Sequence, residues 1–148
     1  MAKPDPALLD PARYPFHCAI PTRFGDLDIN MHVNNVALVG ILEEARVRFN
    51  QASGFRGAVV GQGTNKTQAM IVSFAVEFLG QAYYLQPLDV YVAAASVGRS
   101  SFALLQLATQ EGRIVCSSRA VMVCMEDNRA AALPADFGDS VSPWMLRP

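Results

Sequence analysis

The sequence predicts an α+β fold in which one long helix packs against an antiparallel sheet of about five strands. Apolar residues between positions 36 and 54 recur at spacings of three and four, the period of an amphipathic helix. From about residue 70 to 126 the chain has long runs rich in Val, Ile, Phe and Tyr, which are typical of strands. The turns between some of these runs are short enough for antiparallel hairpins.

A chain of 148 residues has the usual size of a single domain with one core. Residues 1–15 contain four prolines, so we expect an extended lead-in that lies over the surface, followed by one domain over residues 16–148. Residues 16–24 roughly alternate between apolar and polar side chains and predict the first strand. Pro21 places that strand at an edge or a bulge.

The helix is the best-defined element of the sequence. Asn34 or Asn35 can cap its first N–H groups, and Gly54 is placed to end it. Its first half is apolar nearly all round, which predicts the deepest burial there, while Glu44 and Arg48 are spaced for an i,i+4 ion pair further on. The face expected to be buried consists of Leu38, Ile41, Leu42, Ala45, Phe49 and Ala52.

The later strands are expected within residues 70–80, 88–98, 101–110 and 112–125, with short turns at 97–100 and 110–113. Apolar residues occupy both phases of their alternation, which indicates that both sheet faces are partly covered. One helix covers only part of that area. Because charged residues make up only 17% of the chain, a second subunit is a plausible cover.

Composition also excludes several classes of function. The formal net charge is −1 and no Lys/Arg cluster occurs, which argues against a nucleic-acid binder. The N-terminal residues form no continuous apolar stretch, so we expect neither a secretory signal nor membrane insertion, and a cytoplasmic location. The three cysteines lack paired spacing, which favours reduced, structural thiols over a disulfide or a zinc site; they are Cys18, Cys116 and Cys124.

Candidate chemistry is concentrated in residues 23–35, RFGDLDINMHVNN, which place acids immediately before the helix. A helix start presents unpaired N–H groups and partial positive charge, so it can polarise a carbonyl oxygen docked there. A nearby carboxylate could then attack the carbonyl carbon or activate water. Thioesters suit this minimal equipment, because a thiol with a pKa of roughly 8.5 is a good leaving group.

This motif, with EEAR at residues 43–46, resembles the signature of the 4-hydroxybenzoyl-CoA thioesterase-like branch of the hot-dog superfamily. The resemblance runs from about His17 to Phe137. It implies a hot-dog fold, in which a curved antiparallel sheet wraps one long central helix. It also implies a homodimer or homotetramer with acyl-CoA bound at a subunit interface, and no cofactor, since coenzyme A is part of the substrate.

The resemblance also implies roles for individual residues. Asp28 matches the family's nucleophile or general base, and the main-chain N–H at Asn35 matches the donor to the thioester carbonyl. Asn34 beside it and Arg99, near the coenzyme A phosphates, are assigned to substrate binding. From its place in the loop, and not from the resemblance, His32 is expected to form hydrogen bonds near Asp28 and to orient it or tune its charge. The chain departs from many relatives at Met31, where they have Gly, and at Leu38, where they have Tyr.

Each of these residues also has a simpler interpretation. Asp28 could merely bond turn amides or cap the helix, and Asp26 is expected to brace the loop. A metal site built from these acids and His32 is disfavoured, because His17 is the only other histidine and no cysteine pair assists.

The other polar side chains with catalytic potential are expected to have ordinary roles. Glu43 and Glu44 could supply a helix carboxylate, but are expected to be solvated or paired with Arg46, Arg48 or Lys66. The serines at 100 and 101 lack the glycines of a nucleophile elbow, which makes a serine hydrolase a poor fit.

Three functions follow from the sequence, in order of preference. The first is a thioesterase that hydrolyses an acyl-CoA or acyl carrier protein thioester. The second is an inactive acyl-CoA-binding or regulatory module, which Met31 and Leu38 motivate. The third is a hot-dog hydratase or dehydratase, for which His32 lies in an HVNN setting rather than the His-Phe-Pro setting of the dehydratases.

Overall fold

A computed structural model describes residues 3–55 and 67–148 of the chain. The helices are α1 (Asn35–Ser53) and the short α3 (Phe137–Val141), and four 3-10 turns cover Pro6–Leu8, Pro11–Arg13, Phe24–Asp26 and Ser142–Trp144. The strands are β1 (Phe16–Ile20), β2 (Thr67–Phe78), β3 (Leu88–Ala95), β4 (Ser101–Gln110), β5 (Arg113–Glu126) and β6 (Arg129–Ala130).

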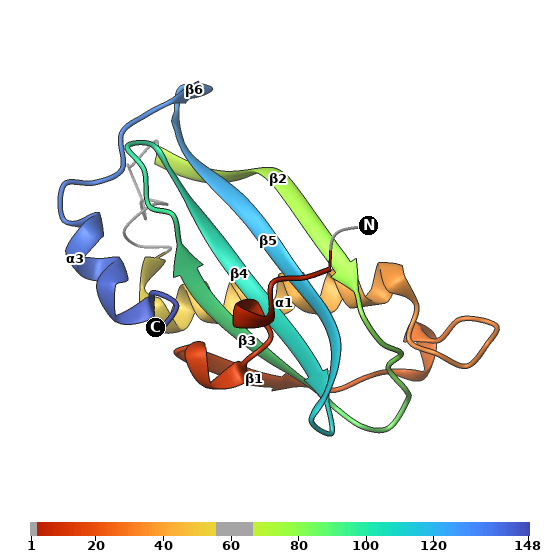
Figure 1. The fold of residues 1–148 in the computed structure, drawn as a ribbon. Helices are drawn as coiled ribbons and strands as arrows, with labels where there is room; N and C mark the ends of the chain where they lie inside the picture. Colours follow the sequence, from red (N-terminus) through yellow and green to blue (C-terminus); the bar gives the residue numbers. More distant parts are fainter. Residues whose placement is uncertain (1–2, 56–66) are drawn as a thin grey trace.

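The strands form one antiparallel sheet in the order β1-β3-β4-β5-β2, and β6 pairs with β5. The sheet curves around α1, which lies along one face (Figure 1). The longest pairing joins β2 to β5, with Phe74 opposite Ala120 and a bulge between Ile71 and Ser73. The predicted architecture, one long helix held by a curved antiparallel sheet, is confirmed.

The ends of α1 are where the sequence predicts them. Asn34 caps the helix, its Oδ1 accepting from the Val36 N–H at 2.8 Å, and Gly54 ends it with a φ of 76°. Five of the six side chains expected to be buried are buried, but Ala52 is exposed. The core position there is taken by Phe55, whose ring lies 5.2 Å from that of Phe49.

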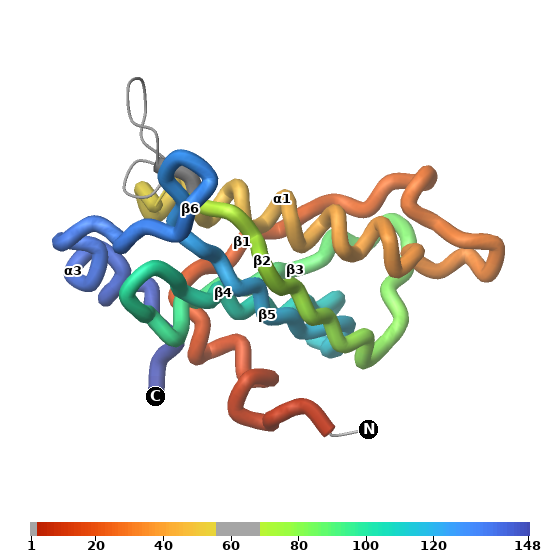
Figure 2. The backbone as a smooth tube through the Cα atoms, turned by 90° about the horizontal axis from the view of Figure 1, so that it is seen from above, coloured from red at the N-terminus to blue at the C-terminus, as the bar shows by residue number. Residues whose placement is uncertain are grey.

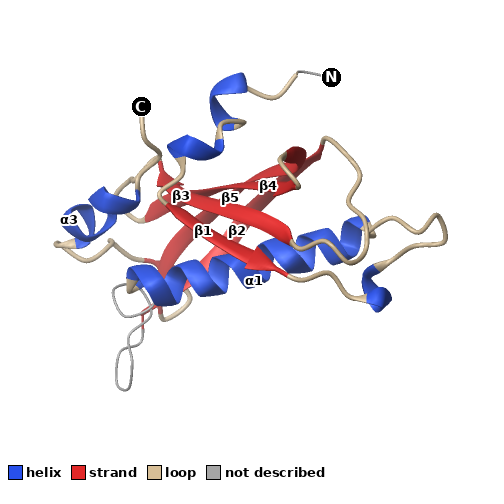
Figure 3. Cartoon of the chain, turned by 90° about the horizontal axis from the view of Figure 1, so that it is seen from below, coloured by secondary structure: helices blue, strands red, loops and turns tan. Residues whose placement is uncertain are grey.

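Burial along α1 is deepest in its middle and second half, contrary to the prediction. Leu42, Ala45 and Phe49 have no exposed area, whereas Val36 in the first turn is 81% exposed. The first turn reaches beyond the strands, toward the loops at that end of the molecule (Figure 3). Apolar composition alone therefore does not locate the most deeply buried part of the helix.

A buried arginine joins α1 to the sheet. The Arg46 Nη1 donates to the Gln106 Oε1 at 2.9 Å, and its guanidinium lies 4.6 Å from the centre of the Phe74 ring. Gln106 donates in turn to the Leu42 carbonyl at 2.8 Å, and it accepts from the Ser118 hydroxyl at 3.2 Å. Loss of solvation lowers the pKa of Arg46, but a cation–π contact and a hydrogen bond offset part of that cost.

The partners predicted for Glu43 and Glu44 are therefore only partly confirmed. The Arg48 Nε lies 3.0 Å from the Glu44 Oε1, which confirms the i,i+4 pair. Arg46 instead donates to Gln106, and no salt bridge joins it to Glu43 or Glu44 among the described residues. Lys66, the third candidate partner, lies outside the described residues.

The N-terminal segment covers the face of the sheet opposite α1 (Figure 2). It is not fully extended as predicted, because residues 6–8 and 11–13 form 3-10 turns, each with proline at its first position and an aspartate cap. Tyr14 packs beneath it, 5% exposed, and donates its hydroxyl hydrogen to the Leu8 carbonyl at 2.8 Å. The Arg147 N–H donates to the Arg13 carbonyl, so the two chain ends are joined.

Candidate active site

A small hairpin, residues 27–33, leads directly into α1 and projects beyond its N-terminal end (Figure 1). Leu27 and Val33 form its base as an antiparallel bridge, and the Asp28 N–H donates to the His32 carbonyl at 2.9 Å. The Asn34 N–H donates to the Asp26 carbonyl at 2.8 Å. These bonds fix the acidic hairpin relative to the first turn of the helix.

Asp28 is half-buried, and one of its carboxylate oxygens is held by the hairpin. Oδ1 accepts from the main-chain N–H groups of Asn30 at 2.9 Å and His32 at 3.1 Å. Within residues 3–55 and 67–148, no hydrogen bond engages Oδ2. The simpler interpretation, a carboxylate that braces its turn, describes Oδ1, and the second oxygen is available for chemistry.

The start of α1 supplies main-chain donors. Asn34 uses its side chain on Val36 and its carbonyl on the Leu38 N–H, at 2.8 and 2.9 Å. The Asn35 N–H makes no hydrogen bond to any described residue. An N–H free at a helix N-terminus can donate to an oxyanion, as the sequence predicts for this position.

His32 packs on a tyrosine that sequence reasoning missed. The His32 and Tyr83 ring centres are 5.3 Å apart at 83°, and the two residues form an antiparallel bridge. The Gln110 side chain holds Tyr83 by two main-chain hydrogen bonds of 2.8 Å. The available signal was Gln110 itself, a side-chain amide ending a predominantly apolar strand.

Asp26 has the bracing role expected of it. It is 6% exposed, and its carboxylate accepts from the Arg23 main-chain N–H at 2.8 Å and from the Arg23 Nη2 at 3.0 Å. Both bonds close the 3-10 turn Phe24–Asp26. Asp26 is thus committed to the loop, which leaves Asp28 as the acid with an open oxygen.

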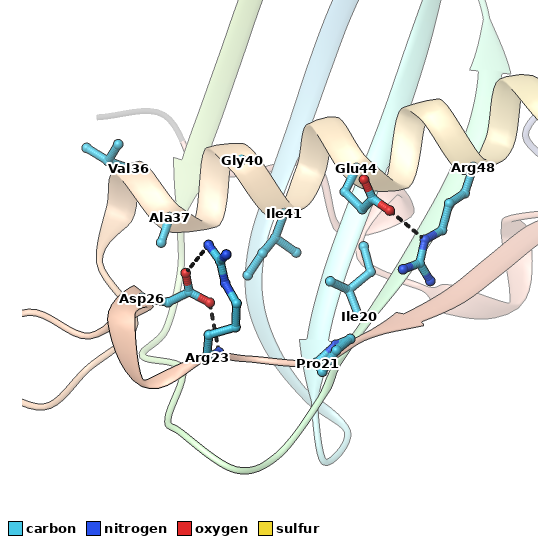
Figure 4. A pocket seen from close by; sticks show the side chains of 10 residues that line it. All are labelled: Ile20, Pro21, Arg23, Asp26, Val36, Ala37, Gly40, Ile41, Glu44 and Arg48. Carbon is cyan, nitrogen blue, oxygen red and sulfur yellow. Dashed lines mark hydrogen bonds and ion pairs between the residues drawn. The ribbon is translucent and has the colours of Figure 1, made fainter.

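A groove of about 550 Å³ lies between the end of β1 and the N-terminal half of α1 (Figure 4). Its floor is apolar, and two ion pairs, Arg23 with Asp26 and Arg48 with Glu44, stand at its sides. Asp28 is not among the residues that line it. The groove and the Asp28 hairpin therefore flank the same helix end without sharing the carboxylate.

The structure does not bring Arg99 to Asp28 within one chain. Arg99 lies between β3 and β4, and its carbonyl accepts from the Leu133 N–H at 2.8 Å. Phe102, just after it, packs on Phe55 beyond the C-terminal end of α1. Nineteen residues of helix rise by roughly 28 Å, so the arginine and the carboxylate lie at opposite ends of α1.

Leu38, one of the two positions expected to differ from the family motif, lies in the core. It is 2% exposed, so its side chain is used for packing. In the described part of the chain, no three His, Cys, Asp or Glu side chains gather in a way that could hold a metal ion. Cys18, Cys116 and Cys124 are free thiols, as predicted. Among the described helices, none has the length and hydrophobicity needed to cross a membrane.

Comparison with known proteins identifies the family. The model of the thioesterase-like superfamily matches residues 22–144, and the chain belongs to this superfamily, whose fold is the hot-dog fold. A thioesterase from Thermus thermophilus, solved in complex with coenzyme A and Zn, is similar over 92% of this chain and 98% of its own, with 26% identity and a TM-score of 0.77.

A second solved structure supports the same fold. It is described as "a predicted thioesterase" from Bacillus stearothermophilus and is 21% identical over 90% of this chain and 98% of its own, with a TM-score of 0.77. A search of curated proteins gave no significant match. The motif resemblance seen in the sequence, to a thioesterase family with the hot-dog fold, is thereby confirmed.

Proposed function

We propose that the protein hydrolyses acyl-CoA thioesters to a free acid and a thiol, with Asp28 as the reacting carboxylate. The observation that carries the proposal is that the two carboxylate oxygens of Asp28 differ in their hydrogen bonds. Two main-chain donors fix Oδ1, while Oδ2 has no partner among the described residues. The hairpin that carries Asp28 runs directly into the first turn of α1, where the Asn35 N–H has no partner among the described residues. The related thioesterase solved with coenzyme A supports this substrate class.

The chemistry needs only these groups. The Asn35 N–H, with the partial charge of the helix start, stabilises the negative charge that develops on the thioester oxygen. In one route the Asp28 carboxylate bonds to the carbonyl carbon, the C–S bond breaks, the thiolate leaves, and water hydrolyses the anhydride. In the other, Asp28 takes a proton from water as that water attacks the carbon, the C–S bond breaks, and the proton passes to the leaving thiolate. Both routes consume one water molecule and release the acid and the thiol.

We propose further that the working unit contains a second copy of the chain. Among the described strands β2 pairs only with β5, and three successive residues on it are apolar and exposed: Met70, Ile71 and Val72. An unprotected apolar edge of this kind is a template for strand pairing. Antiparallel pairing about a twofold axis sets opposite ends of the two chains side by side. In this arrangement Arg99 of one copy can bind the coenzyme A of a substrate that reacts at Asp28 of the other copy.

A thiol-release assay tests the function. Purified protein is given acyl-CoAs of increasing chain length, aromatic acyl-CoAs and an acyl carrier protein thioester, and free thiol is followed colorimetrically. Turnover of at least one of them supports the proposal. Tight binding of acyl-CoA without thiol release would instead assign the protein to the regulatory class, and hydration of an enoyl-CoA would assign it to the hydratases. Light scattering on the same sample reports whether the copies pair.

A further inference from the structure

We propose that Tyr83 is a positioning residue for the reacting carboxylate, acting through His32 and the His32 main-chain N–H on Asp28. The inference rests on the proposed function. It adds how the projecting hairpin that carries Asp28 is held in a fixed position. Tyr83 lies in the connection between β2 and β3, far from Asp28 in sequence.

The main chain of Tyr83 is fixed to the rigid part of the molecule. Gln110, 1% exposed at the end of β4, accepts from the Tyr83 N–H and donates to the Tyr83 carbonyl, both at 2.8 Å. It donates as well to the Gln86 carbonyl at 2.9 Å. Because this buried amide uses its acceptor and its donor on the loop, it ties the main chain of Tyr83 to the end of β4.

The other side of Tyr83 faces the hairpin. The carbonyl of the preceding residue, Ala82, accepts from the Val33 N–H at 2.8 Å, and the Tyr83 ring meets the His32 imidazole at 5.3 Å and 83°. The Arg113 guanidinium lies 5.5 Å from the centre of the same ring. The ring is thus held by an aromatic contact and a cation–π contact, both directional.

The main chain of His32 in turn contacts the carboxylate of Asp28. The His32 N–H is one of the two donors on the Asp28 Oδ1, at 3.1 Å. If His32 shifts, Oδ1 loses part of its anchor and Oδ2 swings relative to the Asn35 N–H. Small misplacements of a reacting group lower the chemical step steeply, whereas substrate contacts elsewhere are unchanged. The expected signature is a loss in kcat with little change in KM.

The loop offers a matched control. Tyr84 is the next residue and has similar exposure, 38% against 44% for Tyr83, but its ring packs on Phe24 at 6.0 Å rather than on His32. Tyr84→Ala removes the same number of atoms from the same loop. A general effect of truncating this loop would therefore appear in both variants, and a positioning effect only at Tyr83.

The experiment measures kcat and KM on the best acyl-CoA for five variants: Tyr83→Ala, Tyr83→Phe, Tyr84→Ala, Asp28→Asn and the Asp28→Asn/Tyr83→Ala double variant. Tyr83→Ala is expected to lose about tenfold or more in kcat with KM within about twofold of wild type. Tyr83→Phe, which keeps the ring and main chain, restores most of the rate, and Tyr84→Ala leaves kcat unchanged. Combined with Asp28→Asn, Tyr83→Ala causes no further loss from the residual rate, because the group it positions is already gone.

The outcomes separate the two proposals. Equal kcat values in Tyr83→Ala and Tyr84→Ala, or the same tenfold loss from Tyr83→Ala in both backgrounds, would overturn the positioning role while the thioesterase stands. A wild-type protein that releases no thiol from any substrate overturns the proposed function and this inference with it.

Discussion

The Met31 N–H donates to the Asp28 carbonyl at 3.0 Å, and this turn holds Met31 at a φ of 62°. The left-handed region costs a side-chain-bearing residue roughly 1–2 kcal/mol, a cost that glycine avoids. Met31 is 58% exposed, so packing within one chain returns little of that cost. Met31 thus occupies a strained turn next to the proposed reacting group.

Met31→Gly is therefore expected to raise the unfolding free energy by about 0.5–1 kcal/mol, the steric relief less the backbone entropy that glycine adds. Urea unfolding of the two proteins measures the difference. Ile29→Gly is the control, since Ile29 is 95% exposed in the same hairpin and is not among the residues with positive φ. Equal losses of stability in both variants would contradict the strain argument.

Asn35→Pro tests the main-chain donor at the helix start. Proline is tolerated at the first helical position, and Asn34 has the extended conformation, φ −62° and ψ 142°, that a following proline requires. The variant should keep the helix and lose about 10²–10³ in kcat, because one oxyanion donor is removed. Asn35→Ala keeps the N–H and should lose far less. Comparable rates in the two variants would show that this N–H does not contact the substrate oxygen.

Stability is expected to fall in alkali, because two buried groups must lose their protons. Burial raises the pKa of Cys116 to about 12 and that of Tyr14 also to about 12. Both values exceed those of the unfolded chain, so each group stabilises the fold below its unfolded pKa and loses that contribution as pH rises toward 12. Urea midpoints from about pH 8 to 11.5 should decline from about pH 9 upward. Tyr14→Phe should flatten the decline, and an unchanged slope would contradict this assignment.

Local sequence rules located most of the fold. The cap at Asn34, the stop at Gly54, the long strands and the Glu44–Arg48 pair each depend on neighbours along the chain, and each is found in the structure. The burial of Arg46 was not predicted, because it depends on Gln106 and Phe74 from two different strands. No spacing along the helix carries that information.

In the candidate site, too, residues close in sequence were predicted and residues from distant segments were not. Asp28, His32 and the helix start lie together because one hairpin joins them, and a motif within thirteen residues is enough to predict that. Tyr83 and Gln110 come from distant segments and were missed. Arg99 lies at the far end of α1, and its distance from Asp28 could not be predicted because it depends on how the sheet packs on the helix.

Thiol release by Asp28→Asn tests the central claim most directly. The amide oxygen can still accept from the Asn30 and His32 N–H groups, so the hairpin is retained while the negative charge is removed. Wild-type protein should hydrolyse acyl-CoA, and the variant, folded and equally able to bind acyl-CoA, should lose at least about 10³ in kcat. Wild-type rates in this variant would contradict the assignment of Asp28 as the reacting carboxylate.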